Sequence, residues 1–114
     1  MAVFASRQIV MPVLPIVVTI TGTGRSGYCY ATINGTKQYS AGTHEVNTGD
    51  TIIFGVYGRD SSAPGTVTIN GTEVLRVTHN SMQTYDWTVP KGISTVEIAM
   101  AYSLSRGRIT VTTA

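Results

Sequence analysis

The sequence predicts an all-β domain, and three observations lead to this prediction. Apolar and polar residues alternate with period two along almost the whole chain, and no window of about 11 residues has a capped helical stripe. The pentapeptide Thr-Ile-Asn-Gly-Thr occurs at 32–36 and again at 68–72. Asn-Gly between strand-like runs is typical of a type I′ hairpin turn, because both central residues need positive φ. We therefore expect hairpin tips at Asn34-Gly35 and Asn70-Gly71.

Turn sequences divide the chain into about nine expected strands. Glycine, proline, asparagine or serine interrupts the alternation at each boundary. The expected strands are 16–20, 28–33, 36–40, 51–57, 66–69, 72–78, 84–89, 96–102 and 109–111.

The two short hairpin loops also predict which residues face each other. In the first hairpin Ile33 faces Thr36, and Tyr30 faces Tyr39 as a cross-strand aromatic pair. In the second hairpin Val67 faces Val74, and Ile69 faces Thr72. The segment around His44 to Val46 is expected to be a short connection.

Short strands at this spacing favour a β-sandwich over a closed barrel. We expect 8–9 antiparallel strands in two sheets. The run 51–57 is the expected central strand, with Ile52, Phe54 and Val56 on one buried face. The chain then divides into an N-terminal arm, 1–15, and a sandwich domain, 16–114.

The arm is apolar and contains Pro12 and Pro15. It lacks the basic start of a signal peptide, and the prolines interrupt any bilayer-spanning run. Its large apolar side chains must pack on something, since burying each one contributes roughly 1.5–3 kcal/mol. Either the arm is a first strand on the domain's own core, or it docks on a neighbouring subunit. The residues expected to make such a docking contact are Val3, Phe4, Ile9, Val10 and Leu14.

The composition favours a protein that works within a larger assembly. Hydrophobic residues make up 42% of the chain and charged residues only 12%, about half the usual share. The net charge of +2 is too small and too dispersed for a nucleic-acid footprint. Arg106-Gly107-Arg108 clusters, and a turn is the simplest interpretation.

No catalytic, metal or cofactor signature is present in the sequence. Cys29 is the sole cysteine, which excludes an intrachain disulfide, and it shares a strand face with Ala31 and Ile33 as an expected buried thiol. His44 and His79 do not have metal-ligand spacing, and the carboxylates are dispersed. We therefore expect a non-enzymatic protein with no cofactor.

Four tyrosines form the main candidate for a ligand-binding face. The apolar C–H face of a pyranose ring matches an aromatic ring, so an exposed tyrosine platform could bind a glycan. Tyrosine is also a good strand former, and half-buried tyrosines are common on sandwich faces. The four residues are Tyr28, Tyr30, Tyr39 and Tyr57.

The run Val46-Asn47-Thr48-Gly49-Asp50-Thr51-Ile52, followed by an Ile-Asn-Gly-Thr hairpin, resembles the small immunoglobulin-like domains of tailed-phage virion proteins, among them capsid decoration proteins. The resemblance covers roughly residues 16–113. It implies an Ig-like sandwich that binds a protein lattice or a surface polymer, and no functional residue carries over.

From this resemblance and the apolar arm we expect a capsid decoration or cement subunit on the virion surface. Its expected partners are the major capsid protein or sibling subunits, with homo-oligomers also expected and with neither nucleic acid nor membrane as a partner. The alternative is a carbohydrate- or host-surface-binding module of a tail, fibre or adhesin at a cell surface.

Overall fold

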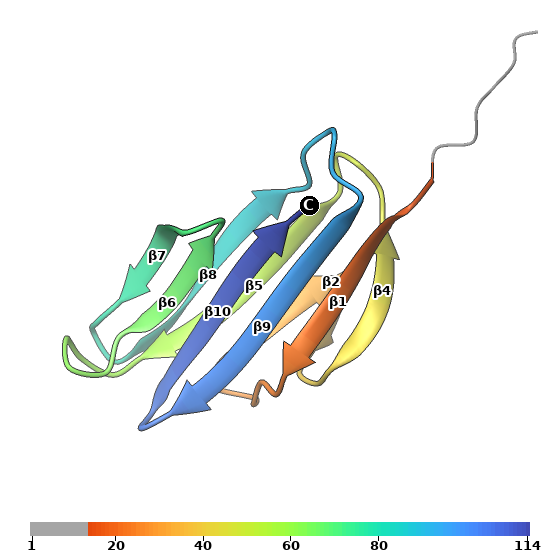
Figure 1. The fold of residues 1–114 in the computed structure, drawn as a ribbon. Helices are drawn as coiled ribbons and strands as arrows, with labels where there is room; N and C mark the ends of the chain where they lie inside the picture. The colour runs from red at the N-terminus through yellow and green to blue at the C-terminus, as the bar shows by residue number, and fades with distance from the viewer. Residues whose placement is uncertain (1–13) are drawn as a thin grey trace, which may run out of the picture.

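The computed structural model describes residues 14–114, and these form two β-sheets (Figure 1). Ten strands and no helix occur in this part of the chain, so the all-β prediction is confirmed. The predictions for Val3, Phe4, Ile9 and Val10 lie outside the described residues.

The larger sheet has six strands in the order β4-β1-β9-β10-β6-β7. Their bounds are β1 Ile16–Gly22, β4 Gly42–Val46, β6 Gly65–Ile69, β7 Thr72–Val77, β9 Thr95–Ser103 and β10 Arg106–Thr113.

The smaller sheet has four strands in the order β3-β2-β5-β8 and packs behind the larger one (Figure 1). Their bounds are β2 Cys29–Ile33, β3 Thr36–Gln38, β5 Thr51–Gly58 and β8 Ser81–Thr88.

The strand count and the purely antiparallel arrangement were wrong. The tenth strand is β4, which pairs with β1 and places His44 opposite Val18. Val46 is the one buried residue of this edge strand. The sequence of β4 therefore lacks the apolar alternation from which a strand is predicted. Two neighbours are parallel, β1 with β9 and β10 with β6. A turn sequence predicts the pairing of two strands only when they follow each other in the chain. The strands of these parallel pairs are far apart in the sequence, so no turn indicates their pairing.

The two Asn-Gly turns are confirmed. Asn34 and Gly35 have φ of 51° and 79°, and Asn70 and Gly71 have 49° and 83°. This is the left-handed backbone that a type I′ turn requires.

The registers of the hairpins were predicted in part. Ile33 faces Thr36 as expected, and β3 ends at Gln38 rather than at residue 40. In the second hairpin Ile69 faces Thr72, but a bulge shifts the register so that Val67 faces Leu75. The predicted pairing of Val67 with Val74 was therefore wrong, because a bulge places one extra residue on β7.

The hydrophobic core lies between the two sheets. Alternate residues of the central strands point inward, as Ile52, Phe54 and Val56 do on β5 and Ile98 and Met100 do on β9. Phe54 is the largest fully buried side chain, and its ring lies 6.3 Å from that of Trp87. The prediction that β5 is a core strand is confirmed.

Candidate ligand-binding end of the sandwich

Four loops meet at one end of the sandwich. Strand pairing places Gly22 beside Met100, Cys29 beside Val56, and Gly58 beside Ser81. The loops adjoining these residues, 23–28, 59–64, 78–80 and 104–105, therefore lie at the same end. We call this the loop end. The two Asn-Gly turns and the start of β1 lie at the opposite end (Figure 1).

A cluster of aromatic side chains lies at the loop end. The rings of Tyr28 and Tyr102 stack at 5.6 Å with an interplanar angle of 26°, and Tyr57 meets Tyr28 edge-on at 6.2 Å. The guanidinium carbon of Arg25 lies 5.3 Å from the Tyr28 ring centre and 5.9 Å from that of Tyr102. We call Tyr28, Tyr57, Tyr102 and Arg25 the tyrosine cluster. It offers aromatic surface together with a cation.

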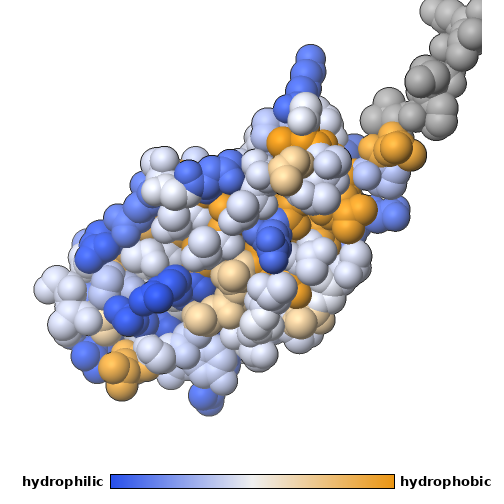
Figure 2. All heavy atoms as spheres, in the orientation of Figure 1, coloured by the Kyte–Doolittle hydropathy of each residue, from blue (hydrophilic) through white to orange (hydrophobic). Residues whose placement is uncertain are grey.

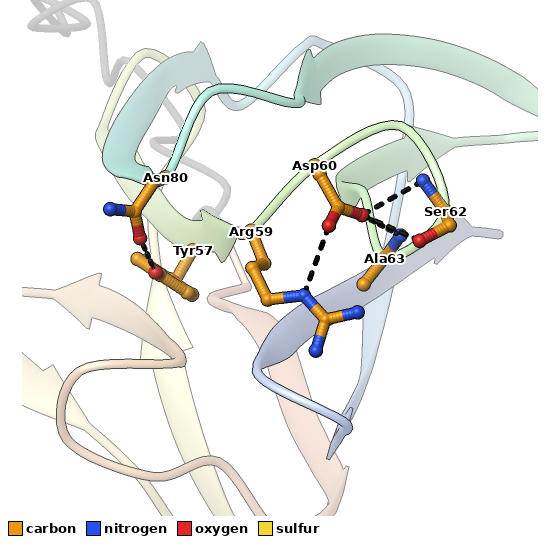
Figure 3. Close-up of polar contacts among 6 residues, drawn as sticks. All are labelled: Tyr57, Arg59, Asp60, Ser62, Ala63 and Asn80. Atoms are coloured by element: carbon orange, nitrogen blue, oxygen red, sulfur yellow. Dashed lines mark hydrogen bonds and ion pairs between the residues drawn. The ribbon is translucent and has the colours of Figure 1, made fainter.

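The hydroxyl of Tyr57 is held from the neighbouring loop. It donates a hydrogen bond to the side-chain oxygen of Asn80, as Figure 3 shows. Asn80 has φ of 53°, a left-handed conformation that asparagine tolerates better than most residues. The bond therefore fixes one ring of the tyrosine cluster to the start of β8.

The other two predicted tyrosines form a separate group. Tyr30 and Tyr39 have ring centres 6.0 Å apart, and the ammonium of Lys37 lies 4.6 Å from the Tyr30 ring centre. Tyr30 lies over Gly55 and is only 9% exposed. The structure therefore divides the four predicted tyrosines into two pairs, and Tyr30 offers little free ring surface.

A small pocket opens on the hairpin that joins β9 to β10. Its volume is about 170 Å³, and its lining residues are Ala101, Tyr102, Ser103, Arg106 and Arg108. The expectation that Arg106-Gly107-Arg108 forms a turn was wrong: these residues begin β10. The turn is Leu104-Ser105 instead.

The Leu104-Ser105 turn has an unusual backbone. Both residues have positive φ, 49° and 64°, where the other two tight hairpins place asparagine and glycine. A left-handed conformation costs an ordinary L-residue roughly 1–2 kcal/mol. Leu104 is also 78% exposed. The hairpin tip therefore combines backbone strain with an exposed apolar side chain.

The loop between β5 and β6 is organised by Asp60 (Figure 3). Its carboxylate accepts hydrogen bonds from the Ser62 hydroxyl at 2.7 Å and from the backbone N–H groups of Ser62 and Ala63, both at 2.9 Å. Arg59 donates a further bond at 3.1 Å. The Ser62 hydroxyl is the largest of the causes that lower the pKa of Asp60.

Cys29 is a buried structural thiol. It is 0% exposed, in agreement with the sequence prediction, and its Sγ donates to the carbonyl oxygen of Ala101 at 3.5 Å. Burial raises the pKa of this thiol. A raised pKa disfavours the nucleophilic thiolate, so Cys29 is not suited to covalent chemistry.

Neither a metal cluster nor a membrane-spanning helix is found in residues 14–114. No three His, Cys, Asp or Glu side chains gather there as metal ligands would. No helix in that range has the length and apolarity that crossing a membrane needs.

At the opposite end, apolar side chains face solvent where β1 begins. Leu14 is 80% exposed and Val17 is 37% exposed. Figure 2 shows hydrophobic surface at this place, whereas the face of the larger sheet is mostly weakly polar. Of the predicted arm contacts, Leu14 is the one that the structure describes.

The sequence did not predict the contact of Tyr102 with Arg25 or the pocket at the loop end. The sequence pattern assigns Tyr102 to the expected strand 96–102 and gives no role to Arg25. Their proximity depends on packing between β9 and the loop before β2, which are more than 70 residues apart. The repeated arginines around Gly107 were the available signal for the pocket.

Comparisons of the chain with protein-family models, with curated proteins and with solved structures found no match. The functional argument therefore depends on the geometry of the chain itself.

Proposed function

We propose that this chain is a non-enzymatic virion structural protein, most specifically a capsid decoration or cement subunit with an Ig-like sandwich. In this proposal the sandwich projects outward, and the segment 1–15 attaches it to the major capsid protein or to sibling subunits.

One observation carries this proposal: apolar side chains face solvent where β1 begins. Leu14 is 80% exposed, and Val17 on the same stretch is 37% exposed. Large apolar side chains grouped at a surface indicate a contact with another molecule. The sequence just before them is also apolar, so the apolar stretch continues into the segment proposed to dock.

The composition of the larger sheet is consistent with packing on a lattice. Many of its outward-facing positions are threonine or alanine, including Thr19 and Thr21 on β1, Ala99 on β9, and Thr110 on β10. Small uncharged side chains such as these can approach a partner closely without the cost of desolvating an ion.

The test uses full-length variants in which Phe4 and Ile9, or Leu14 and Val17, are replaced by aspartate. We expect these variants to lose co-sedimentation with capsid particles, or self-association measured by light scattering, while their circular dichroism stays unchanged. The matched control is Leu104→Asp, which charges an equally exposed leucine at the opposite end. Unchanged assembly in both aspartate variants would contradict the proposal.

The second candidate is a carbohydrate- or host-surface-binding module, and the tyrosine cluster favours it. Tyr28 and Tyr102 stack beside Arg25, and Tyr102 is 41% exposed. An exposed ring can bind the C–H face of a sugar. A glycan array in which binding is lost in Tyr102→Ala, and kept in Tyr30→Ala, would support this candidate.

A further inference from the structure

Strand β8 is a free edge of the smaller sheet (Figure 1). Its register with β5 is continuous, and β5 is the one strand within residues 14–114 that pairs with it. At the end of β8 the N–H of Val89 donates at 2.8 Å to the carbonyl oxygen of Asp50, which directly precedes β5. Because main-chain groups alternate along a strand, the N–H and C=O groups of the even-numbered residues point away from β5. These residues are Met82, Thr84, Asp86 and Thr88.

The other three edge strands that the structure describes carry features that obstruct the addition of a further strand. β3 has three residues and β4 has five. β7 contains the bulge and two charged residues, Glu73 and Arg76. Short strands, bulges and charges are the means by which proteins block pairing at an edge. β8 has eight residues, no proline and no register shift, and Asp86 is its one charged residue. It is therefore the described edge that best accepts another strand.

The sequence before the sandwich contains a segment that matches this edge in length and charge. Residues 3–11 form a run without proline, and Pro12 ends it because proline has no N–H to donate. Arg7 is the only charged side chain in the segment 1–15. Opposite charges that face each other across two strands stabilise the pair. The single cation of the segment and the single anion of β8 are therefore complementary.

We propose that residues 3–11 of one copy add to the β8 edge of a neighbouring copy as an antiparallel strand, with Arg7 facing Asp86. The antiparallel direction gives the more stable ladder. Ile9 then faces Thr84. This inference rests on the proposed attachment role of the segment 1–15, and it names the surface of a sibling subunit to which that segment attaches.

The apolar side chains of the segment suit this edge. Tyr85 and Trp87 of β8 pack against the core and are only partly buried. In the proposed register Phe4 and Val10 lie on the same face as these two rings, because alternate residues of a strand share a face. The added strand therefore covers apolar surface that a single copy leaves partly exposed.

This register requires the β8 edge of another copy. It places Met11 beside Met82 at the loop end, whereas β1 begins with Ile16 at the opposite end. The five residue steps from Met11 to Ile16 span at most about 18 Å. The stretch of β8 from Met82 to Thr88 is about 20 Å long by itself, and β1 lies in the other sheet. The segment therefore cannot pair in this way with β8 of its own chain.

The test is sedimentation equilibrium of full-length variants, with co-sedimentation on capsid particles measured beside it. The double variant Phe4→Asp/Ile9→Asp changes the donor segment, and Thr84→Pro changes the acceptor edge. Proline at residue 84 should block strand addition and keep the ladder with β5, because the N–H of Thr84 points away from β5. We expect each variant alone to be monomeric. An equal mixture should form a dimer, since one variant keeps the edge and the other keeps the segment.

A charge exchange tests the register. Arg7→Asp and Asp86→Arg should each weaken self-association roughly fivefold, and the double variant should restore it. Glu45→Arg is the matched control, because it reverses an exposed carboxylate on the edge strand β4 and should change nothing. Circular dichroism that matches the native chain would show that each variant keeps its fold. If Thr84→Pro does not fold, the charge exchange decides the question.

Three results would overturn this inference. These are a native chain that stays monomeric at every concentration, self-association that Asp86→Arg leaves unchanged, or a mixture of the donor and acceptor variants that stays monomeric. In each case a loss of capsid co-sedimentation in Phe4→Asp/Ile9→Asp would still support the proposed function. If that double variant kept both capsid binding and self-association, the proposed function would fail together with this inference.

Discussion

The backbone of Gly107 lies directly against the carbonyl oxygen of Tyr28, across the interface between the two sheets. The same carbonyl accepts a hydrogen bond from the N–H of Tyr57 at 2.8 Å. Gly107 separates the two arginines of the pocket, and Tyr28 and Tyr57 belong to the tyrosine cluster. This contact therefore joins the strand that carries the two arginines to the loop that carries Tyr28.

Replacing Gly107 by alanine should destabilise the domain. The new Cβ would collide with the Tyr28 carbonyl oxygen and would stand 2.8 Å from the Cβ of Cys29. Backbone atoms cannot rotate away as a flexible side chain can, and overpacking typically costs about 1–3 kcal/mol. Urea denaturation should show a loss of that size in the free energy of unfolding.

Gly42→Ala serves as the control for this substitution. A Cβ at residue 42 would meet only the His44 ring nitrogen, at an ordinary 3.5 Å. We expect a change within about 0.5 kcal/mol, as for most surface substitutions. A Gly107→Ala variant as stable as this control would show that the two sheets can separate freely at the loop end.

Local features of the fold could be predicted from the sequence. The Asn34-Gly35 turn fixed both φ signs and the register of its hairpin, because a two-residue loop leaves one pairing. The burial of Phe54 followed from period-two alternation.

Features that depend on distant strands could not be predicted in the same way. The parallel pairing of β1 with β9 joins residues about 78 positions apart, and no turn specifies it. The bulge in β7 could not be predicted, because Thr72–Val77 contains no glycine that would indicate one. The stack of Tyr28 on Tyr102 forms only when the two sheets pack together. The sequence therefore indicated that tyrosines could form a binding face, but it did not predict this pair.

The Leu104-Ser105 turn should become more stable when it is changed to Asn-Gly. Both native residues have positive φ, which asparagine and glycine adopt with less strain. We expect the double substitution to raise the free energy of unfolding by about 1–2 kcal/mol, measured by urea denaturation.

Leu104→Ala separates backbone strain from the exposed side chain in that experiment. It removes the apolar leucine but keeps a Cβ at positive φ, so it should give no comparable gain. If Leu104→Ala and the Asn-Gly double substitution raised the free energy of unfolding equally, the gain would come from removing the exposed leucine side chain and not from relieving backbone strain.

Ser62→Ala should raise the pKa of the Asp60 carboxyl. The Ser62 hydroxyl donates to this carboxylate at 2.7 Å and is the largest cause of its lowered pKa. The backbone N–H donors remain in the variant, so part of the lowering should persist. The measurement is the titration midpoint of the Asp60 carboxyl carbon by NMR. Arg59→Gln is the comparison, since its contribution ranks last, and a larger effect there than in Ser62→Ala would contradict this order.

Cys29 should make the stability of the domain fall at alkaline pH. Burial raises the thiol pKa in the folded state, whereas the unfolded chain releases the same proton near the ordinary value of roughly 8.5. Below that value both states are protonated and the contribution is fully present. As the pH rises toward the folded pKa, the unfolded state alone ionises, so the free energy of unfolding decreases. Urea denaturation between pH 7 and pH 10 should show this decrease, and Cys29→Ala should show a smaller one because the other titrating groups are unchanged. Equal slopes in the two proteins would mean that the thiol ionises as easily in the folded state as in the unfolded chain.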